Sequence, residues 1–527
     1  MKRIKIFGFV IFVFYFFSCP INPALATDIR DSVVKIYTTT NRVDFYHPWQ
    51  TKGSTALIGS GCILNGNRIL TNAHVVSDQT FIQVKKYSDP KKYTAKIVAI
   101  GHDCDLAVLE VEDENFFKDV PALDIGELPS LRDVVNVIGF PTGGDEISIT
   151  EGVVSRIEVT RYVHSFARLL TVQIDAAVNP GNSGGPVVKD GKLIGVAMQV
   201  APYAQNIGYI IPTPVINHFL ADLKDGQYAG FPLVGFEFLR TENPTLREFY
   251  KIKDKKGGIL ISRVLPYSSS SGKLQEGDVI LEIDGVPVAE DGTFQFRNIE
   301  RLLATHLISQ KQIGEKLSFK IIRDGKEQEL TFSLLPFNPF VPNPYSARNP
   351  PYYIYGGFVF TVLSADLLME WNDQGNDAQF RAPIDFSYFY FGSGRLNEEQ
   401  KKEVVVLLNV LPDAINVGYH DYFSLIVTKV NGKDIDSFKD FVLTLNKQKS
   451  QEPYTNIETR EKVQIILKNE DIDSTDKEIL KRNSIPRPYS EEVAQWLQDS
   501  SSKQDPKTLA ERIESEASPA VQKEKIK

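Results

Sequence analysis

The chain has 527 residues, more than a single hydrophobic core accommodates, so we expect three or four folded units. Hydrophobic residues make up 42% and charged residues 24%, which indicates that most of the chain folds into ordinary globular domains. The net charge is −8 and no Lys/Arg-rich tract is present, so nucleic acid is excluded as an expected partner.

The N-terminus has the pattern of a targeting segment. A positive start at residues 2–5 precedes an apolar run of twelve residues at 6–17, and Ala24-Leu25-Ala26 supplies a small-x-small cleavage pattern. As a helix this run spans about 18 Å, less than the ~30 Å of a bilayer core, which favours a cleaved signal over a membrane anchor. A lipid-modified Cys19 is a lesser alternative. The sequence therefore predicts cleavage after Ala26 and a mature protein in the periplasm or outside the cell.

Residues 32–211 contain many short β-type segments separated by Gly, Pro, Asn and Asp. Helical periodicity is almost lacking there, and this combination is typical of β barrels or a β sandwich. A helix from Pro214 to Leu223 is expected to close the region. The expected strands include residues 33–37, 68–71, 81–84, 106–111, 134–139, 149–157, 169–174 and 192–198.

Two smaller αβ units follow, and they share a repeat. ILISRVLP at residues 259–266 matches VVLLNVLP at 405–412, and VILEIDGV at 279–286 matches IVTKVNGK at 426–433. The offset between the matched segments is nearly constant, at 146 and 147 residues. Two strand-like segments at a near-constant offset predict a duplicated unit.

GNSGGP at residues 181–186 is the strongest catalytic signal. A serine nucleophile needs an exposed hydroxyl on a tight turn, with backbone N–H groups beside it that bind the oxyanion. Glycines allow the required dihedral angles and leave room for the substrate carbonyl. Ser183 is therefore the candidate nucleophile, although a Gly-rich turn between two strands would look similar.

His74 and Asp105 are the candidate partners of this serine. His74 lies in LTNAHVV directly after a predicted strand, and Asp105 lies in CDLAVL at the start of another. The order His, Asp, Ser along the chain is that of chymotrypsin-like enzymes. His47, His102 and His164 lie in polar loops outside the motif, and we expect them to be solvated or structural.

TNAHVV, DCDLAVLEV and GNSGGP in this order resemble the trypsin-like domain of HtrA/Deg proteases, over about residues 30–225. The resemblance implies a mostly β fold, with a chymotrypsin/trypsin-like double β-barrel protease domain followed by one typical and one degenerate PDZ domain. Ser183 would attack the scissile carbonyl, His74 would transfer the proton, and Asp105 would orient the imidazole. The backbone N–H groups of Gly181 and Ser183 would form the oxyanion hole.

The expected function is therefore a serine endopeptidase that degrades unfolded or damaged proteins and is regulated by its PDZ domains. The alternative is a proteolytically silent, PDZ-containing chaperone or binding protein.

The second unit resembles a PDZ domain at Leu233-Val234-Gly235-Phe236. This segment is similar to the loop whose N–H groups capture a C-terminal carboxylate, with the peptide added as a strand beside it. In the third unit Gly357-Phe358-Val359-Phe360 replaces the loop, but the Gly277-Asp278 signature becomes Ser424-Leu425. We expect a degenerate PDZ domain whose groove is closed or used for subunit contacts. The arrangement resembles the plant-type Deg branch with two PDZ domains.

The substrate pocket is expected to be apolar. In trypsin the position six before the nucleophile is an aspartate, whereas here it is Ala177. A Lys side chain in such a pocket would leave an ammonium group without a countercharge, so cuts should follow Val, Ile, Ala or similar residues. An acid supplied by a loop, Asp175 or Asp190, is the alternative. The residues expected to line the pocket are Ala177, Val178, Met198 and Val200.

No His, Cys or Asp spacing predicts a metal site, and no cofactor is expected. Cys62 and Cys104 could form a disulfide or remain buried thiols, and the sequence leaves both open. The expected partners are unfolded or misfolded polypeptides and C-terminal peptides at the first PDZ domain. By resemblance to the family, we also expect a homo-oligomer of trimers or multiples of trimers.

The expected division of the chain follows from these patterns. Residues 336–351 are rich in Pro, which favours extended backbone, and the chain after Asp499 is polar and free of aromatic residues. The segments are a signal peptide at 1–26, the trypsin-like protease domain at 27–229, PDZ domain 1 at 230–335, a Pro- and aromatic-rich linker at 336–354, the degenerate PDZ domain 2 at 355–468, a helical extension at 469–498 and a disordered tail at 499–527.

Overall fold

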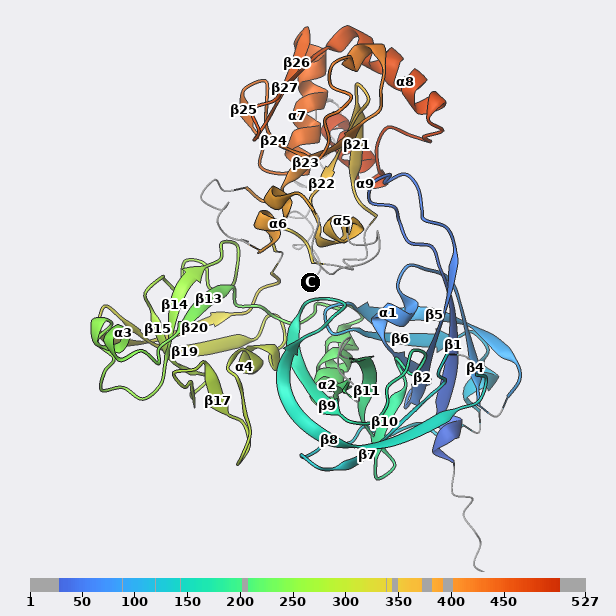
Figure 1. The fold of residues 1–527 in the computed structure, drawn as a ribbon, viewed down its shortest axis with the longest axis vertical. Coiled ribbons are helices and arrows are strands. Elements are labelled where there is room, and N and C mark those ends of the chain that lie inside the picture. Colours follow the sequence, from blue (N-terminus) through green and yellow to red (C-terminus); the bar gives the residue numbers. More distant parts are fainter. Residues whose placement is uncertain are drawn as a thin grey trace, which may run out of the picture.

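The computed structural model describes residues 28–502, except for 88, 119, 143, 201–206, 338, 344–348, 372–381 and 392–400, and except for the side chains of 199–200 and 501–502. The described residues form three units (Figure 1). We call them the two-barrel unit (through residue 225), the second unit (residues 230–335) and the third unit (from residue 352).

The first barrel closes in the order β1-β2-β3-β6-β5-β4. Side chains alternate between its interior and its surface as strand geometry requires, so that in one strand Ile82 and Val84 are buried while Phe81 is 46% exposed. Cys62 and Cys104 are both buried free thiols, and burial raises the pKa of Cys62 to about 12. Its elements are η1 (Ile29–Ser32), β1 (Val33–Thr40), β2 (Thr55–Leu64), β3 (Arg68–Thr71), α1 (Ala73–Val76), β4 (Gln79–Lys86), β5 (Lys92–Gly101), β6 (Leu106–Val111) and η2 (Glu114–Phe117).

The second barrel closes in the order β10-β11-β12-β9-β8-β7. A helix follows its last strand and buries Val215, Ile216 and Phe219 in the barrel core. The double-barrel prediction is confirmed, and each expected strand lies within an observed one. The elements are β7 (Val134–Gly139), β8 (Ser148–Arg161), β9 (Arg168–Ile174), β10 (Pro186–Lys189), β11 (Lys192–Val200), β12 (Gly208–Pro212), α2 (Thr213–Asp222) and η3 (Leu223–Asp225).

The second unit is a sheet in the order β13-β14-β15-β19-β20, with β16 paired to β15 and a separate hairpin of β17 and β18. The hairpin fixes this unit to the second barrel. Phe294 and Leu302 join the core of the two-barrel unit, and the Arg297 guanidinium donates to the carbonyls of Leu128 and Pro129 at 3.1 and 2.9 Å. The elements are β13 (Phe236–Arg240), α3 (Pro244–Phe249), β14 (Ile259–Val264), β15 (Val279–Ile283), β16 (Val286–Pro287), β17 (Thr293–Gln295), β18 (Arg301–Leu303), α4 (Thr305–Ser309), β19 (Lys316–Arg323) and β20 (Lys326–Ser333).

The third unit is a sheet in the order β21-β22-β23-β24-β26-β27, with β25 paired to β24. β14 and β15 are neighbours in the second unit, as β23 and β24 are here, so the predicted duplication is visible in the fold. The elements are β21 (Tyr352–Tyr355), β22 (Phe358–Val362), α5 (Ala365–Glu370), α6 (Ile384–Phe391), β23 (Val405–Val410), η5 (Ala414–Asn416), β24 (Leu425–Val430), β25 (Lys433–Asp434), α7 (Phe438–Gln451), β26 (Tyr454–Thr459), β27 (Gln464–Lys468), η6 (Asn469–Asp471), α8 (Ile472–Arg482) and α9 (Glu491–Ser502).

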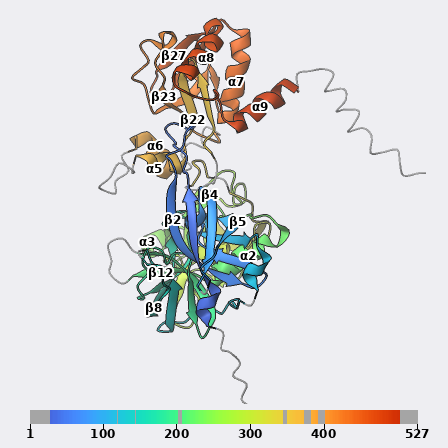
Figure 2. The ribbon, with the colours of Figure 1, turned by 90° about the vertical axis from the view of Figure 1, so that its right-hand side faces the viewer.

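The third unit rests on the two-barrel unit, with α5 and α6 on the side that faces the barrels (Figures 1 and 2). The connection between β1 and β2 extends to the third unit and contacts it. Tyr46 packs on Trp371 with ring centroids 5.0 Å apart, and Lys52 pairs with the buried carboxylate of Glu370 at 2.5 Å. No helix in the described part of the chain is long and apolar enough to cross a membrane.

Candidate active site

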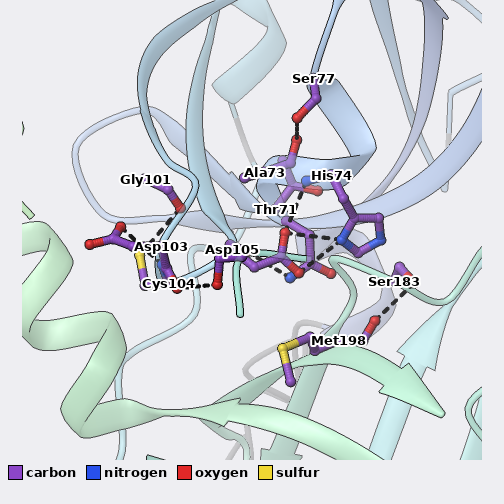
Figure 3. Close-up of polar contacts among 12 residues, drawn as sticks. Thr71, Ala73, His74, Ser77, Gly101, Asp103, Cys104, Asp105, Ser183 and Met198 are labelled. Carbon is purple, nitrogen blue, oxygen red and sulfur yellow. Dashed lines mark hydrogen bonds and ion pairs between the residues drawn. The ribbon is translucent and has the colours of Figure 1, made fainter. Parts of the chain in front are cut away.

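His74 and Asp105 are held together by both main-chain and side-chain contacts in the first barrel (Figure 3). His74 lies in α1 directly after β3, and Asp105 precedes β6 with a left-handed φ of 54°. The His74 Nδ1 atom lies 2.8 and 3.0 Å from the two carboxylate oxygens of Asp105, and the His74 N–H donates to Oδ1 at 2.9 Å. The Asn72 side-chain amide donates to the Asp105 carbonyl at 2.9 Å, which fixes the backbone there.

The Asp105 carboxyl is fully buried, yet its ionised form is favoured. Burial alone would raise its pKa, but the electrostatic interaction with His74 and the hydrogen bonds from that residue outweigh the burial and hold the pKa of Asp105 below its ordinary value. The ionised carboxylate therefore fixes the His74 tautomer and stabilises an imidazolium when one forms.

Ser183 lies in the segment that leads into β10 of the second barrel, across from His74 (Figure 3). The hydrogen bond recorded for its hydroxyl goes to the Met198 carbonyl at 3.4 Å, and within the described residues none joins it to His74. A distance of 3.4 Å is long for such a bond, so little opposes rotation of the hydroxyl toward the imidazole. Catalytic hydrogen bonds of this kind commonly tighten only when substrate binds.

The turn before the serine fixes the direction of a backbone donor, the Gly181 N–H. Asn182 N–H donates to the Asn179 carbonyl at 2.9 Å, with Pro180 second in the turn and Gly181 third at φ 97°, which is a type II turn. The Pro180 carbonyl accepts from the Thr142 N–H at 2.7 Å. Because the peptide is trans, the Gly181 N–H points the opposite way, away from Thr142.

Ser60 on β2 holds this turn in place, and no motif in the sequence indicated it. Its N–H donates to the Ser183 carbonyl at 2.9 Å, and its hydroxyl donates to the Gly181 carbonyl at 2.7 Å while accepting from the Phe140 N–H at 2.9 Å. A Cβ on Gly184 would lie 2.2 Å from the Ser60 carbonyl oxygen, which explains the glycine. Ser60 therefore connects the first barrel to the nucleophile turn of the second.

His164 is also part of the site, contrary to the expectation of a solvated or merely structural residue. Its ring stacks on the His74 ring with centroids 4.1 Å apart and planes 14° apart. Burial and, to a smaller extent, the neighbouring His74 lower the pKa of His164 to about 4, against the raising effect of Asp105. The sequence contained no signal for this, because the contact joins the β8–β9 loop to α1 across the two barrels.

His74, Asp105 and His164 bring their potential metal-ligating atoms within 4.8 Å of one another. A metal ion lies in the plane of each imidazole that binds it. The two rings are nearly parallel and stacked, so their lone pairs lie in separate planes and do not converge on one point. Both Asp105 oxygens also contact His74 Nδ1. The arrangement is built for proton transfer and fits a resident metal poorly.

The predicted pocket residues lie in different environments. Met198 and Val178 are buried in the core of the second barrel, whereas Ala177 is exposed. The side chain of Val200 lies outside the described part of the structure. The carboxylate of Asp175 accepts a hydrogen bond from the Val153 N–H at 2.6 Å.

The second unit presents its predicted peptide loop next to a sheet edge. The Gly235 carbonyl accepts hydrogen bonds from the hydroxyls of Ser268 and Ser270 at 3.3 and 2.9 Å, and Gly235 has a φ of 83°. β13 follows the loop and is the edge strand of its sheet. A peptide strand can therefore be added there.

The third unit fills the same place with its own chain. β21 pairs with β22 through a two-residue turn at Gly356 and Gly357, whose φ values of 58° and 78° fit a type I′ turn. The N–H groups of these glycines donate to the carboxylate of Asp476 on α8 at 3.1 and 3.0 Å. Of the two alternatives for this groove, closure is the one that these contacts support.

Comparison with known proteins agrees with the fold. The family profile of the trypsin-like peptidase domain matches residues 59–196, and PDZ domain profiles match residues 248–292 and 341–492. These matches and the two barrels define a trypsin-like serine protease that carries two PDZ domains.

The curated relatives place this class more narrowly. Protease Do-like 4, mitochondrial, of Arabidopsis thaliana is 42% identical over 410 residues, covering 78% of this chain and 75% of the relative. Putative protease Do-like 3, mitochondrial, of the same plant is 38% identical over 480 residues, covering 91% and 83%. Protease Do-like 2, chloroplastic, also from Arabidopsis thaliana, is 39% identical over 467 residues, covering 88% and 75%.

The chain therefore belongs to the HtrA/Deg family of serine proteases, and nothing in these comparisons favours the proteolytically silent alternative. Among solved structures, an HtrA-type protease with a decapeptide aligns at 26% identity and a TM-score of 0.48, covering 60% of this chain and 97% of that one.

The relatives overturn the predicted location. Several are named mitochondrial or chloroplastic, so the prediction of a secreted, periplasmic protein with a signal peptide cleaved after Ala26 is wrong. The N-terminal pattern on which it relied lies outside the described residues. A positive start followed by an apolar run does not itself specify which membrane a chain meets.

Proposed function

We propose that His74, Asp105 and Ser183 act as one catalytic unit that hydrolyses peptide bonds in unfolded or damaged proteins. The observation that carries the proposal is the buried, ionised Asp105, which contacts His74 Nδ1 at 2.8 Å. His74 Nε2 then removes the proton of Ser183 as its oxygen attacks the scissile carbonyl. The resulting imidazolium gives that proton to the leaving amine, and water releases the acyl group by the same steps in reverse.

The proposed oxyanion hole consists of the backbone N–H groups of Gly181 and Ser183. The orientation of the Gly181 N–H, fixed by Thr142 and Ser60, supports this role. Donors already aimed at the developing negative charge need no reorganisation during the reaction, and one such donor contributes about 3 kcal/mol.

We further propose that cleavage follows small aliphatic residues. Ala177 stands where a Lys- or Arg-specific enzyme needs an acid, and the hydrogen bond from Val153 to Asp175 argues against that carboxylate as a substitute. Met198 contributes its carbonyl beside Ser183, and the pocket wall is proposed to include Val178 and Val200.

The second unit is the proposed docking site for substrate or regulatory peptides with a free C-terminus. The open edge of β13 and the loop at residues 233–236 support this assignment. We keep the division of the chain proposed from the sequence, but count α8 and α9 with the third unit, because Ile472 and Val493 lie in its core. Assembly into trimers or their multiples stays a prediction.

The experiment is digestion of a permanently unfolded protein by the full chain, with mass mapping of every cut and Ser183→Ala as the matched control. We expect cuts after Val, Ile and Ala, and none above background with the variant. Cuts dominated by Lys and Arg would contradict the pocket, and equal digestion by Ser183→Ala would contradict the catalytic unit.

A further inference from the structure

The loop between β8 and β9, residues 162–167, covers the catalytic base. It brings the His164 ring onto one face of the His74 ring, nearly parallel and 4.1 Å away. From this geometry, and resting on the proposed catalytic role of His74, we propose that His164 is a positioning residue for the base and that helix α6 of the third unit holds it there.

The inner side of this loop is fixed to the barrels. The Tyr162 side chain is buried, and its hydroxyl donates to the Leu170 carbonyl at 2.7 Å. The Ser165 hydroxyl donates to the Asp103 carbonyl at 2.8 Å, two residues before Asp105. The loop that carries His164 is therefore tied to the segment that carries the acid of the catalytic unit.

The outer side of the loop is held by the third unit. The Arg161 guanidinium lies 4.1 Å from the centre of the Phe166 ring, and Phe166 packs against Tyr390 of α6 with centroids 6.4 Å apart. Arg161 also hydrogen-bonds to the Tyr390 side chain. Helix α6 thus contacts Arg161 and Phe166 at the two ends of the loop, and the same loop places His164 on the face of His74.

The chemistry of the base explains what this contact does. His74 becomes positively charged in each step of the reaction, and a neutral aromatic face stabilises a cation stacked on it. A charged His164 would repel it instead, and His164 stays neutral because burial lowers its pKa to about 4. Among the described residues, His74 and Asp105 are titratable groups that shift the pKa of His164, the first lowering it and the second raising it. The stacked ring also restricts rotation of the base and excludes water from that face.

The first test measures how fast a fluorophosphonate labels Ser183 and how kcat and KM change for a peptide substrate. We expect His164→Ala to lower the labelling rate and kcat by about tenfold with KM within about twofold, because the contact strengthens only when His74 is charged. His164→Phe keeps a stacking ring and should recover most of the rate. Thermal unfolding of each variant separates loss of folding from loss of rate.

The second test addresses α6. Tyr390→Ala should lower kcat by about threefold in the same way, and should add little to His164→Ala, because the two act through one contact. Ile384→Ala is the control on the same helix, since the Ile384 side chain is 84% exposed. An unchanged labelling rate in folded His164→Ala, or no recovery in His164→Phe, would overturn the inference. Failure of the wild type to be labelled would overturn the proposed function and this inference together.

Discussion

The second and third units share one fold, yet they treat the same sheet edge in opposite ways. In the second unit β13 is left as an edge strand beside the Gly235 loop. In the third unit the matching strand, β22, is covered by β21, and the two glycines of the connecting turn donate to Asp476. In the third unit β21, the Gly-Gly turn and the Asp476 carboxylate thus make an internal strand of the one that matches the edge strand of the second unit.

The comparison teaches that a PDZ repeat can be kept as a structural part. The third unit presents α6 and Trp371 to the two-barrel unit and receives the β1–β2 connection through Tyr46 and Glu370. Because β21 pairs along β22, this edge of the third unit is already occupied by its own chain. The second unit keeps its edge open and is joined to the barrels through the β17–β18 hairpin.

The largest expected effect is on peptide affinity, when the loop beside the open β13 edge is distorted. A Cβ at Gly235 would lie 2.1 Å from the Ser268 Cβ, and Gly235 has a φ of 83°, so Gly235→Ala must distort the loop. We expect a peptide with a free, apolar C-terminus to lose about 100-fold in affinity for the full chain, measured by fluorescence anisotropy. Gly272→Ala is the matched control, because its φ is also positive, at 69°, but open space surrounds it. Binding that persists in Gly235→Ala would place the peptide elsewhere, including on the third unit.

A second prediction concerns the stability of the third unit, where Asp476 holds the turn between β21 and β22. Asp476→Ala leaves the Gly356 and Gly357 N–H groups buried without an acceptor, and should cost about 3 kcal/mol of the third unit's free energy of unfolding. Asp473→Ala, on the same helix, removes a carboxylate that is 75% exposed and should change it by at most about 0.5 kcal/mol.

Tryptophan fluorescence during denaturation measures the free energy of unfolding of the third unit directly. All three tryptophans of the chain lie in the third unit or pack against it, since Trp49 contacts Tyr352, Trp371 contacts Phe386 and Trp496 contacts Phe438. Equal effects of the two substitutions would show that the carboxylate does not hold the turn.

A smaller effect concerns pH. Burial raises the pKa of Asp476 to about 6, against the lowering effect of its two hydrogen bonds. The folded unit therefore holds this proton between about pH 4 and pH 6 while the unfolded chain releases it. The stability associated with the proton is present at pH 4 and is lost as the pH rises through 6, by about 2 to 3 kcal/mol. Asp476→Asn does not titrate at this position. Its free energy of unfolding relative to that of the wild type should therefore increase as the pH rises from 4 to 6. A constant difference between the two proteins would contradict the raised pKa.

The sequence predicted the barrels and the candidate triad because both depend on local patterns. The barrel strands are short β-type segments separated by Gly, Pro, Asn and Asp, and His74, Asp105 and Ser183 each lie in a short motif next to a strand. The duplication of the second and third units was also visible, since both copies keep the strands that end before Pro266 and Pro412.

The residues that the sequence did not predict act through long-range contacts. Ser60 reaches a turn 121 residues away, and Asp476 reaches glycines 119 and 120 residues away. His164 joins the site only because the β8–β9 loop folds over α1. A single serine, aspartate or histidine outside a motif gives no local pattern in the sequence. These contacts can therefore be identified only in the folded structure.

The measurement that tests the central claim most directly is kcat/KM for the three single alanine variants at His74, Asp105 and Ser183 and for their double variants. Residues that act as one unit are strongly non-additive, so we expect each single change to cost at least about 10⁴-fold and a second change to add little. Equivalent folding, checked by thermal unfolding, is the control. Near-normal turnover by Ser183→Ala, or losses that multiply in the double variants, would contradict a catalytic unit built from these three residues.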